Sequence, residues 1–158
     1  VKSNQKQSKA IKKAINVVLL EMWSWHEYFE PTPKGLSPGK GVVLKDEGAE
    51  LTVVTAGPIL NNVLAALDGI FANLIYYNVL KPFDAEPLQK FKDTKIKVVH
   101  DAFGLFEAVC ENIDAPVEKL GLPDRFCCSY GTIEDVRKLA GLDTKSIREF
   151  LQTDRAAI

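Results

Sequence analysis

The sequence predicts one α/β domain with a mostly parallel sheet, preceded by an amphipathic helix. Stretches rich in β-forming residues alternate with helical patterns from residue 42 onward, which is typical of βαβ units with right-handed crossovers. The 158 residues hold 46% hydrophobic and 26% charged side chains. That length and composition suit a single folded domain and exclude an intrinsically disordered chain.

Residues 8–29 predict the amphipathic helix. Apolar side chains recur there every three or four residues, which places them on one face of a helix: Ile11, Ile15, Val18, Met22, Trp25 and Phe29. Residues 1–13 contain five lysines and no acidic residue. The pattern leaves two interpretations open: a helix packed on its own domain or on a sister subunit, or one that docks on a partner or a membrane surface.

Residues 31–41 predict a linker or a surface loop. Three prolines and three glycines fall within this segment, and Pro and Gly interrupt helices and strand pairing. The chain is therefore expected to consist of a helical extension at 1–30, a linker at 31–41 and a domain at 42–158.

Strands and helices then alternate to the end of the domain. Segments rich in β-branched and aromatic residues predict strands: 42–45, 51–55, 73–80, 95–100 and 116–120. Segments with helical spacing predict helices: 57–69, 84–91, 104–112, 132–140 and 144–152. Their order favours a sheet with helices packed against it.

Residues typical of helix ends support these boundaries. Pro58 suits a first helical turn and Gly69 suits a helix end. Asp84 is expected to cap the second helix, and Thr132 and Asp143 are expected to cap the last two.

Composition excludes several classes of function. The net charge of -1 argues against a nucleic-acid-binding surface over the whole domain. The longest apolar stretches, 17–20 and 63–67, are far shorter than the roughly 20 residues that cross a bilayer. The three cysteines form neither a CxxC pair nor an even disulfide framework, which predicts a cytoplasmic protein.

Candidate site residues follow the predicted strands, because ligands of open parallel sheets bind beyond the carboxyl ends of the strands. Gly57 offers backbone N–H groups at a helix start to an anion; alternatively, it is the small residue that a tight turn requires. His100 and Asp101 form an acid–base pair if their side chains converge, or else His100 is a hydrogen-bonded residue at a strand end. With only two histidines, no histidine-rich metal site is expected.

Five segments, taken in order, resemble the C-terminal domain of the transketolase family of thiamine diphosphate enzymes. They are Gly39-Lys40-Gly41, 51–57, 79–84, 121–126 and Gly141-Leu142-Asp143. The resemblance spans about residues 34–151 and is strongest to the deoxyxylulose phosphate synthase branch.

This resemblance implies a three-layer domain with a five-stranded, mostly parallel sheet. It also implies the third domain of a dimeric enzyme that transfers two-carbon units between sugar phosphates or condenses pyruvate with one. In that family, thiamine diphosphate and Mg²⁺ bind between two preceding domains, and this chain contains neither of them. We therefore expect the chain alone to bind no cofactor and no metal, and to be catalytically inactive.

The resemblance also nominates substrate-facing residues. Lys34 stands where the family has an arginine-rich approach, and a cation there could bind a sugar phosphate. Tyr130 lies close to the position at which the family has a histidine. His100 is the first residue of the segment that stands where the family has an acidic pair. We expect these three side chains to contact substrate only in the complete enzyme.

Two functions are compatible with these observations. One is a non-catalytic C-terminal domain or subunit of a thiamine diphosphate-dependent transferase, which serves dimer assembly and substrate entry. The alternative is a freestanding binding or regulatory module that retains the fold without the chemistry. A third hypothesis, an autonomous enzyme that uses His100 and Asp101, has the least support.

Overall fold

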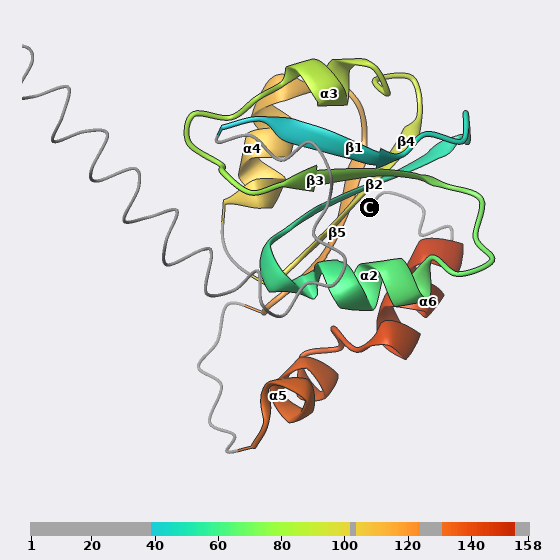
Figure 1. Ribbon diagram of the computed structural model, residues 1–158, viewed down its shortest axis with the longest axis vertical. Helices are drawn as coiled ribbons and strands as arrows, with labels where there is room; N and C mark the ends of the chain where they lie inside the picture. The colour runs from blue at the N-terminus through green and yellow to red at the C-terminus, as the bar shows by residue number, and fades with distance from the viewer. Residues whose placement is uncertain (1–38, 102–103, 124–130, 154–158) are drawn as a thin grey trace, which may run out of the picture. The chain divides into compact units, whose positions relative to one another are not determined.

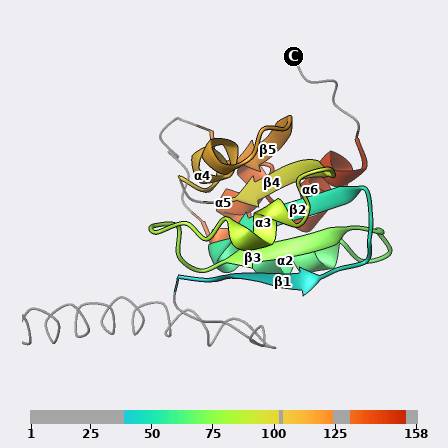
Figure 2. The same cartoon turned by 90° about the horizontal axis from the view of Figure 1, so that it is seen from above.

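A five-stranded sheet forms the centre of the computed structural model, which describes residues 39–101, 104–123 and 131–153 (Figure 1). Its strands lie in the order β1-β3-β2-β4-β5 (Figure 2). β1 is antiparallel to β3, and the other neighbours are parallel. The predicted five-stranded, mostly parallel sheet is confirmed. The strands are Gly41–Lys45 (β1), Leu51–Ala56 (β2), Asn73–Tyr77 (β3), Lys95–His100 (β4) and Val117–Gly121 (β5).

β1 and β2 are neighbours in sequence but do not pair, because β3 lies between them. The connecting segment is held by the buried side chain of Asn73, the first residue of β3. Its Oδ1 accepts hydrogen bonds from the backbone N–H groups of Glu47 (3.0 Å) and Ala49 (3.3 Å). Its Nδ2 donates to the carbonyl oxygen of Ala49 (2.9 Å). One buried amide thus replaces the strand pairing that a hairpin would supply.

Different helices cover the two faces of the sheet. α2 and α6 lie together, on the side of the sheet opposite α3 and α4 (Figure 1). A short 3₁₀ turn, Gly57–Ile59, precedes α2. The domain therefore has three layers, as predicted. The helices are Leu60–Ala66 (α2), Glu86–Gln89 (α3), Leu105–Asn112 (α4), Ile133–Leu139 (α5) and Thr144–Gln152 (α6).

Successive side chains of each strand point to opposite faces of the sheet. On the face of α3 and α4, buried strand residues pack against Leu88, Phe91, Leu105 and Val109: Val54, Ile75, Tyr77, Ile96 and Val98. Nearly continuous apolar strands such as β2 and β3 are expected when both faces of a parallel sheet are covered.

The segment between β3 and α3 differs from the prediction. β3 ends at Tyr77 rather than at Leu80, and α3 covers only Glu86–Gln89. Ala85 occupies the assigned cap position of α3 without a side-chain cap. The Asp84 carboxylate, one residue earlier, accepts a hydrogen bond from the Glu86 N–H (3.4 Å), so the prediction that Asp84 caps this helix is right in part. The same carboxylate also accepts a hydrogen bond from the Gly41 N–H (3.1 Å), and the Asp84 backbone oxygen accepts one from the Tyr77 hydroxyl (3.0 Å). These long-range contacts hold the segment as a loop.

The predicted caps of the last two helices are confirmed. Thr132 and Asp135 form a reciprocal capping box at the start of α5, in which the Asp135 carboxylate accepts from the Thr132 N–H (2.9 Å). Asp143 caps α6: its carboxylate accepts from the backbone N–H (3.0 Å) and the hydroxyl (2.8 Å) of Ser146.

Replacing Asp143 with Asn is expected to reduce the free energy of unfolding by roughly 0.3–1 kcal/mol, because the amide still caps the helix but loses the interaction of a negative charge with the helix N-terminus. Hydrogen bonds from the backbone and the side chain of Ser146 lower the pKa of Asp143 below its ordinary value. A lowered folded-state pKa gives stability that is present above the unfolded pKa of about 4 and is lost as the pH falls through the folded value. In urea titrations, the difference between the wild type and the variant should therefore shrink below about pH 4.

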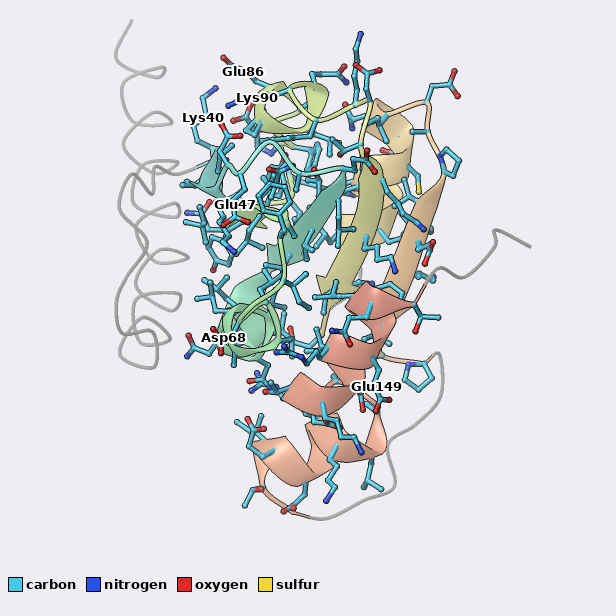
Figure 3. All side chains as sticks on the ribbon, turned by 90° about the vertical axis from the view of Figure 1, so that its right-hand side faces the viewer. Lys40, Glu47, Asp68, Glu86, Lys90 and Glu149 are labelled. Atoms are coloured by element: carbon cyan, nitrogen blue, oxygen red, sulfur yellow. The ribbon has the colours of Figure 1, made fainter. Side chains whose placement is uncertain are left out.

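A matched control for this experiment is Asp68→Asn, which removes the same charge from an exposed position (Figure 3). That variant should change stability by less than about 0.5 kcal/mol. A wild-type to Asp143→Asn difference that stays constant down to strongly acidic pH would contradict the assignment of Asp143 as an ionised cap.

Lys97 of β4 is buried, with 1% of its surface exposed, and it points toward α6. Its Nζ donates hydrogen bonds to the carbonyl oxygens of Phe150 (2.7 Å) and Thr153 (2.6 Å), and it lies 3.5 Å from Oε2 of Glu118. The carbonyl end of a helix carries partial negative charge. A strand lysine thus stabilises the end of α6, a role that the sequence analysis did not predict.

The amphipathic helix predicted over 8–29 and the linker residues up to 38 lie outside the described residues. The predicted boundaries at residues 30 and 41 therefore stay predictions. Among the helices that the structure describes, none has the length and apolar character needed to cross a membrane.

Candidate functional site

A cavity of about 170 Å³ lies at the carboxyl ends of β2, β3 and β4. Its lining includes Gly57, Asn78, His100 and Asp101, each of which directly follows or ends a strand. β3 lies on one side of β2 and β4 on the other, while α2 and α4 cover opposite faces. The strand order reverses at this point, which is where open α/β sheets bind ligands. The strand-end rule applied to the sequence, that ligand-binding residues follow the carboxyl ends of the strands, therefore leads to a cavity in the structure.

Gly57 directly follows β2 and has a φ of +73°, in the left-handed region that favours glycine. The backbone of Gly57 forms a hydrogen bond with the buried hydroxyl of Tyr76. Burial raises the pKa of Tyr76, this hydrogen bond lowers it, and the nearby charge of Asp101 raises it further. The role of Gly57 in binding an anion stays a prediction.

His100 ends β4, and its side chain lies against the neighbouring strand β5. The residue is 6% exposed, and it pairs in register with Gly121. A Cβ atom added at Gly121 would lie 2.7 Å from Nε2 of His100, closer than a non-bonded contact permits. The imidazole therefore occupies the space that the missing side chain of Gly121 leaves.

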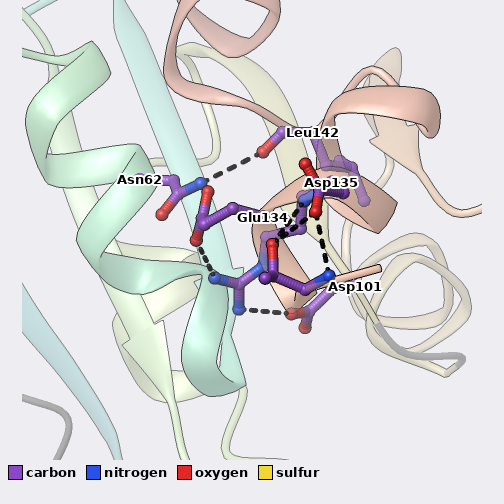
Figure 4. Close-up of polar contacts among 7 residues, drawn as sticks. Asn62, Asp101, Glu134, Asp135 and Leu142 are labelled. Atoms are coloured by element: carbon purple, nitrogen blue, oxygen red, sulfur yellow. Dashed lines mark hydrogen bonds and ion pairs between the residues drawn. The ribbon is translucent and has the colours of Figure 1, made fainter. Parts of the chain in front are cut away.

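Asp101 is engaged by Arg137 of α5. Nη2 of Arg137 donates to Oδ2 of Asp101 (3.2 Å), and Nη1 donates to Oε1 of Glu134 (3.0 Å) (Figure 4). The Asp101 and Arg137 side chains are 15% and 12% exposed, so the pair is partly desolvated. Arg137 thereby neutralises the carboxylate at the edge of the cavity.

The sequence analysis missed two of these residues, Asn78 and Arg137. Asn78 directly follows β3, and the strand-end rule would have identified it had β3 been predicted to end at Tyr77. Its buried Oδ1 has no hydrogen-bond partner among the described residues. No local signal identifies Arg137, because its partner lies 36 positions away in the sequence.

Two other predicted site residues, Lys34 and Tyr130, lie outside the described residues. Their proximity to the cavity therefore stays a prediction. Of the four candidates, the structure brings Gly57 and His100 to the same cavity.

Asn78, His100 and Asp101 give the cavity three polar side chains. An imidazole, an amide and an arginine-paired carboxylate offer hydrogen bonds to a small polar molecule. No serine, cysteine or lysine lies among the described lining residues.

The described part of the chain does not supply the grouped ligands that a protein-bound metal requires. Within residues 39–101, 104–123 and 131–153, no three His, Cys, Asp or Glu side chains are grouped as metal ligands. Mg²⁺ requires oxygen ligands in a near-octahedral arrangement, usually carboxylates together with phosphate and water. We therefore assign no step of cofactor chemistry to these residues.

The segments that resemble the transketolase family have structural roles. Lys40 lies 3.6 Å from Asp84 and 3.7 Å from Glu86, and Figure 3 shows Lys40 and Glu86 at the same end of the domain. At Gly41, a Cβ atom would lie 2.5 Å from Cε1 of Tyr77. The Gly39-Lys40-Gly41 and 79–84 segments thus contact each other through Lys40, Gly41 and Asp84, and Tyr77 requires a glycine at position 41.

Comparison with known sequences gives the same family. The chain is 34% identical over 142 residues to 1-deoxy-D-xylulose-5-phosphate synthase of Azobacteroides pseudotrichonymphae, covering 80% of this chain and 22% of that protein. It is 30% identical over 149 residues to the synthase of Parabacteroides distasonis, covering 85% of this chain and 23% of the relative. The chain thus spans less than a quarter of the length of these relatives. No family model matches it.

Solved structures give the same fold. A split-gene transketolase, described as an inactive beta4 tetramer, superposes with a TM-score of 0.63 at 28% identity, covering 74% of this chain and 42% of that one. Transketolase from Campylobacter jejuni superposes with a TM-score of 0.60 at 14% identity, covering 78% of this chain and 20% of that one. By sequence and by fold, the chain belongs to the transketolase family and carries a transketolase C-terminal-like domain.

Proposed function

We propose that the chain is the non-catalytic C-terminal domain or subunit of a thiamine diphosphate-dependent transketolase-like transferase. The observation that carries this proposal is its 34% identity to a synthase of which it spans only 22%. The described residues also lack a group of metal ligands. The catalytic cofactor then belongs to other domains, and this chain supplies an assembly surface.

In the complete enzyme, the chain would act with cofactor-binding domains and as part of a dimer, in the cytoplasm. Lys34, His100 and Tyr130 would contact the sugar phosphate substrate at the entrance to the active site. The reaction would be ketol transfer or condensation of pyruvate with an aldose phosphate. The similarity to a chain of a split-gene transketolase supports a subunit arrangement.

Calorimetric titration of thiamine diphosphate with Mg²⁺ tests this proposal. The purified chain alone is expected to give no binding heat, and its mixture with the cofactor-binding domains encoded in the same genome is expected to bind the cofactor and transfer ketol units. The matched control is the cofactor-binding domains alone, which should turn over ketose phosphates at least about tenfold more slowly, a loss of about 1.4 kcal/mol of transition-state stabilisation.

Two outcomes would contradict the proposal. One is tight cofactor binding by this chain alone. The other is turnover by the cofactor-binding domains that is unchanged when this chain is added. The second outcome would favour the alternative, a freestanding binding module.

The observation that favours the freestanding module is the apolar stripe predicted on a helix over residues 8–29, together with the five lysines of residues 1–13. In that case, deletion of residues 1–30 would abolish partner capture while leaving the domain folded. Partner capture that survives the deletion unchanged would exclude a docking role for this segment.

A further inference from the structure

The cavity at the carboxyl ends of β2, β3 and β4 contains a polar atom whose hydrogen bond is not made within the domain. Asn78 lines this cavity, and its buried Oδ1 accepts no hydrogen bond from the described residues. Burying an acceptor without a partner costs free energy, so folded proteins keep few of them. The amide oxygen is therefore available to a hydrogen-bond donor that enters the cavity.

The cavity has the size of one small molecule. Its volume of about 170 Å³ is close to the roughly 150 Å³ of a protein cavity that accepts benzene. Apolar side chains form much of its wall, among them Pro58, Leu80 and Leu105. The ring of Tyr77 also lines the cavity and stacks on Phe83, with 4.6 Å between the ring centres. A planar ring with a short polar group is of suitable size and shape.

The charges at the edge of the cavity favour a donor that is neutral or positive. Oδ2 of Asp101 accepts from Arg137 at 3.2 Å, and Arg137 also pairs with Glu134 at 3.0 Å (Figure 4). Two carboxylates share one guanidinium, so the group retains a net negative charge. The other oxygen of Asp101, Oδ1, lies 3.6 Å from the place that a Cβ atom of Gly57 would occupy, and both residues line the cavity. The cavity thus offers oxygen acceptors and disfavours an anion.

We propose that this cavity binds a small planar molecule that carries N–H donors and is neutral or cationic. Its donors would bind the side-chain oxygens of Asn78 and Asp101, and its ring would lie against the apolar wall. The inference goes beyond the proposed function, because it concerns a ligand of this chain alone and needs no thiamine diphosphate. The anionic sugar phosphate proposed above to contact His100 is a different molecule.

Three probes of nearly equal shape test the class of ligand: benzamidine, benzamide and benzoate. They share a phenyl ring and differ in their donors and their charge. In NMR titrations of the purified full chain, benzamidine and benzamide are expected to shift the signals of the Asn78 amide and the His100 imidazole until the shifts saturate. Benzoate should bind at least about tenfold more weakly, because it has no donor for Asn78 and faces the carboxylate of Asp101.

The variant Asn78→Leu removes the acceptor and keeps nearly the same side-chain shape. It should weaken benzamidine binding at least about tenfold. It should also raise the urea midpoint of unfolding, because an unpaired acceptor is then no longer buried. A residue that serves only the fold would not give this combination. The matched control is Asn61→Leu, which makes the same exchange at an exposed position of α2 and should bind benzamidine like the wild type.

Four results would overturn the inference. They are the lack of any saturable shift with benzamidine, tighter binding of benzoate, displacement of benzamidine by inorganic phosphate, and unchanged benzamidine binding by a folded Asn78→Leu variant. Tighter binding of benzoate would favour the anion predicted at Gly57, and displacement by phosphate would assign the cavity to the substrate. Failure of the cofactor experiment described above would refute the proposed function and leave this site standing, since the titration uses this chain alone.

Discussion

Replacement of Lys97 with Ala is expected to lower the free energy of unfolding by about 3–5 kcal/mol, the cost of breaking a buried, hydrogen-bonded charge. The ammonium group donates to the carbonyl oxygens of Phe150 and Thr153 and faces the carboxylate of Glu118. Removing it leaves the carbonyl oxygen of buried Phe150 without this donor and the Glu118 carboxylate, 16% exposed, without its buried cation. The truncation also opens a cavity where the alkyl stem of the lysine packs.

Two further variants separate the contributions to this effect. Lys97→Met keeps the apolar stem, so its loss of stability in urea titrations measures the ammonium group. Lys95→Ala removes a lysine on the same strand that also faces Glu118, at 3.7 Å, but is 39% exposed. Surface ion pairs contribute little, so this control should cost less than about 1 kcal/mol. Equal losses for Lys97→Ala and Lys95→Ala would show that burial of Lys97 is not what makes it stabilising.

Replacement of Gly121 with Ala is expected to cost about 1–3 kcal/mol, as overpacking of a filled site does. The added methyl group would meet three ring atoms of His100 at 2.7, 3.0 and 3.1 Å, and the buried ring cannot swing into solvent. Either the imidazole leaves the cavity at the strand ends or the edge strand β5 shifts. The chain has two histidines, so NMR of the imidazole protons should report the displacement of His100 directly.

The double variant Gly121→Ala, His100→Ala is the control for this prediction. With the imidazole removed, the methyl group has room, and the cost of Gly121→Ala should fall close to zero. The double-mutant cycle should therefore show a coupling energy of about 1 kcal/mol or more, as contacting residues do. If the stability losses of the two single variants simply add, Gly121→Ala would destabilise the protein through the backbone of β5 and not through contact with His100.

Local patterns predicted most of the fold. Each strand was located by its β-branched and aromatic residues, and Thr132 and Asp143 marked helix starts because a cap acts within three residues of itself. The same reasoning was right only in part at Asp84, which accepts a hydrogen bond from the Glu86 N–H (3.4 Å) but precedes the assigned cap position, Ala85. There, a hydrogen bond from Gly41, 43 positions away, determines the conformation.

The candidate site was predicted only in part for a similar reason. The strand-end rule found Gly57 and His100, since it depends on where strands stop. It missed Asn78 because Asn78-Val79-Leu80 continues the apolar pattern of β3 beyond the last paired residue, Tyr77. Arg137 is a surface-type residue on a polar helix, and only the folded chain brings it to Asp101.

The sequence by itself determined the α/β class, the order of the elements and the membership of the transketolase family, because these depend on periodicity and on short segments read in order. Three features were decided by the tertiary structure alone. β3 separates β1 from β2, Lys97 is buried against the end of α6, and α5 exposes the apolar side chains of Ile133 and Leu139. The physical reason is that pairing, burial and exposure depend on residues far apart in sequence, whose contacts form only when the sheet assembles.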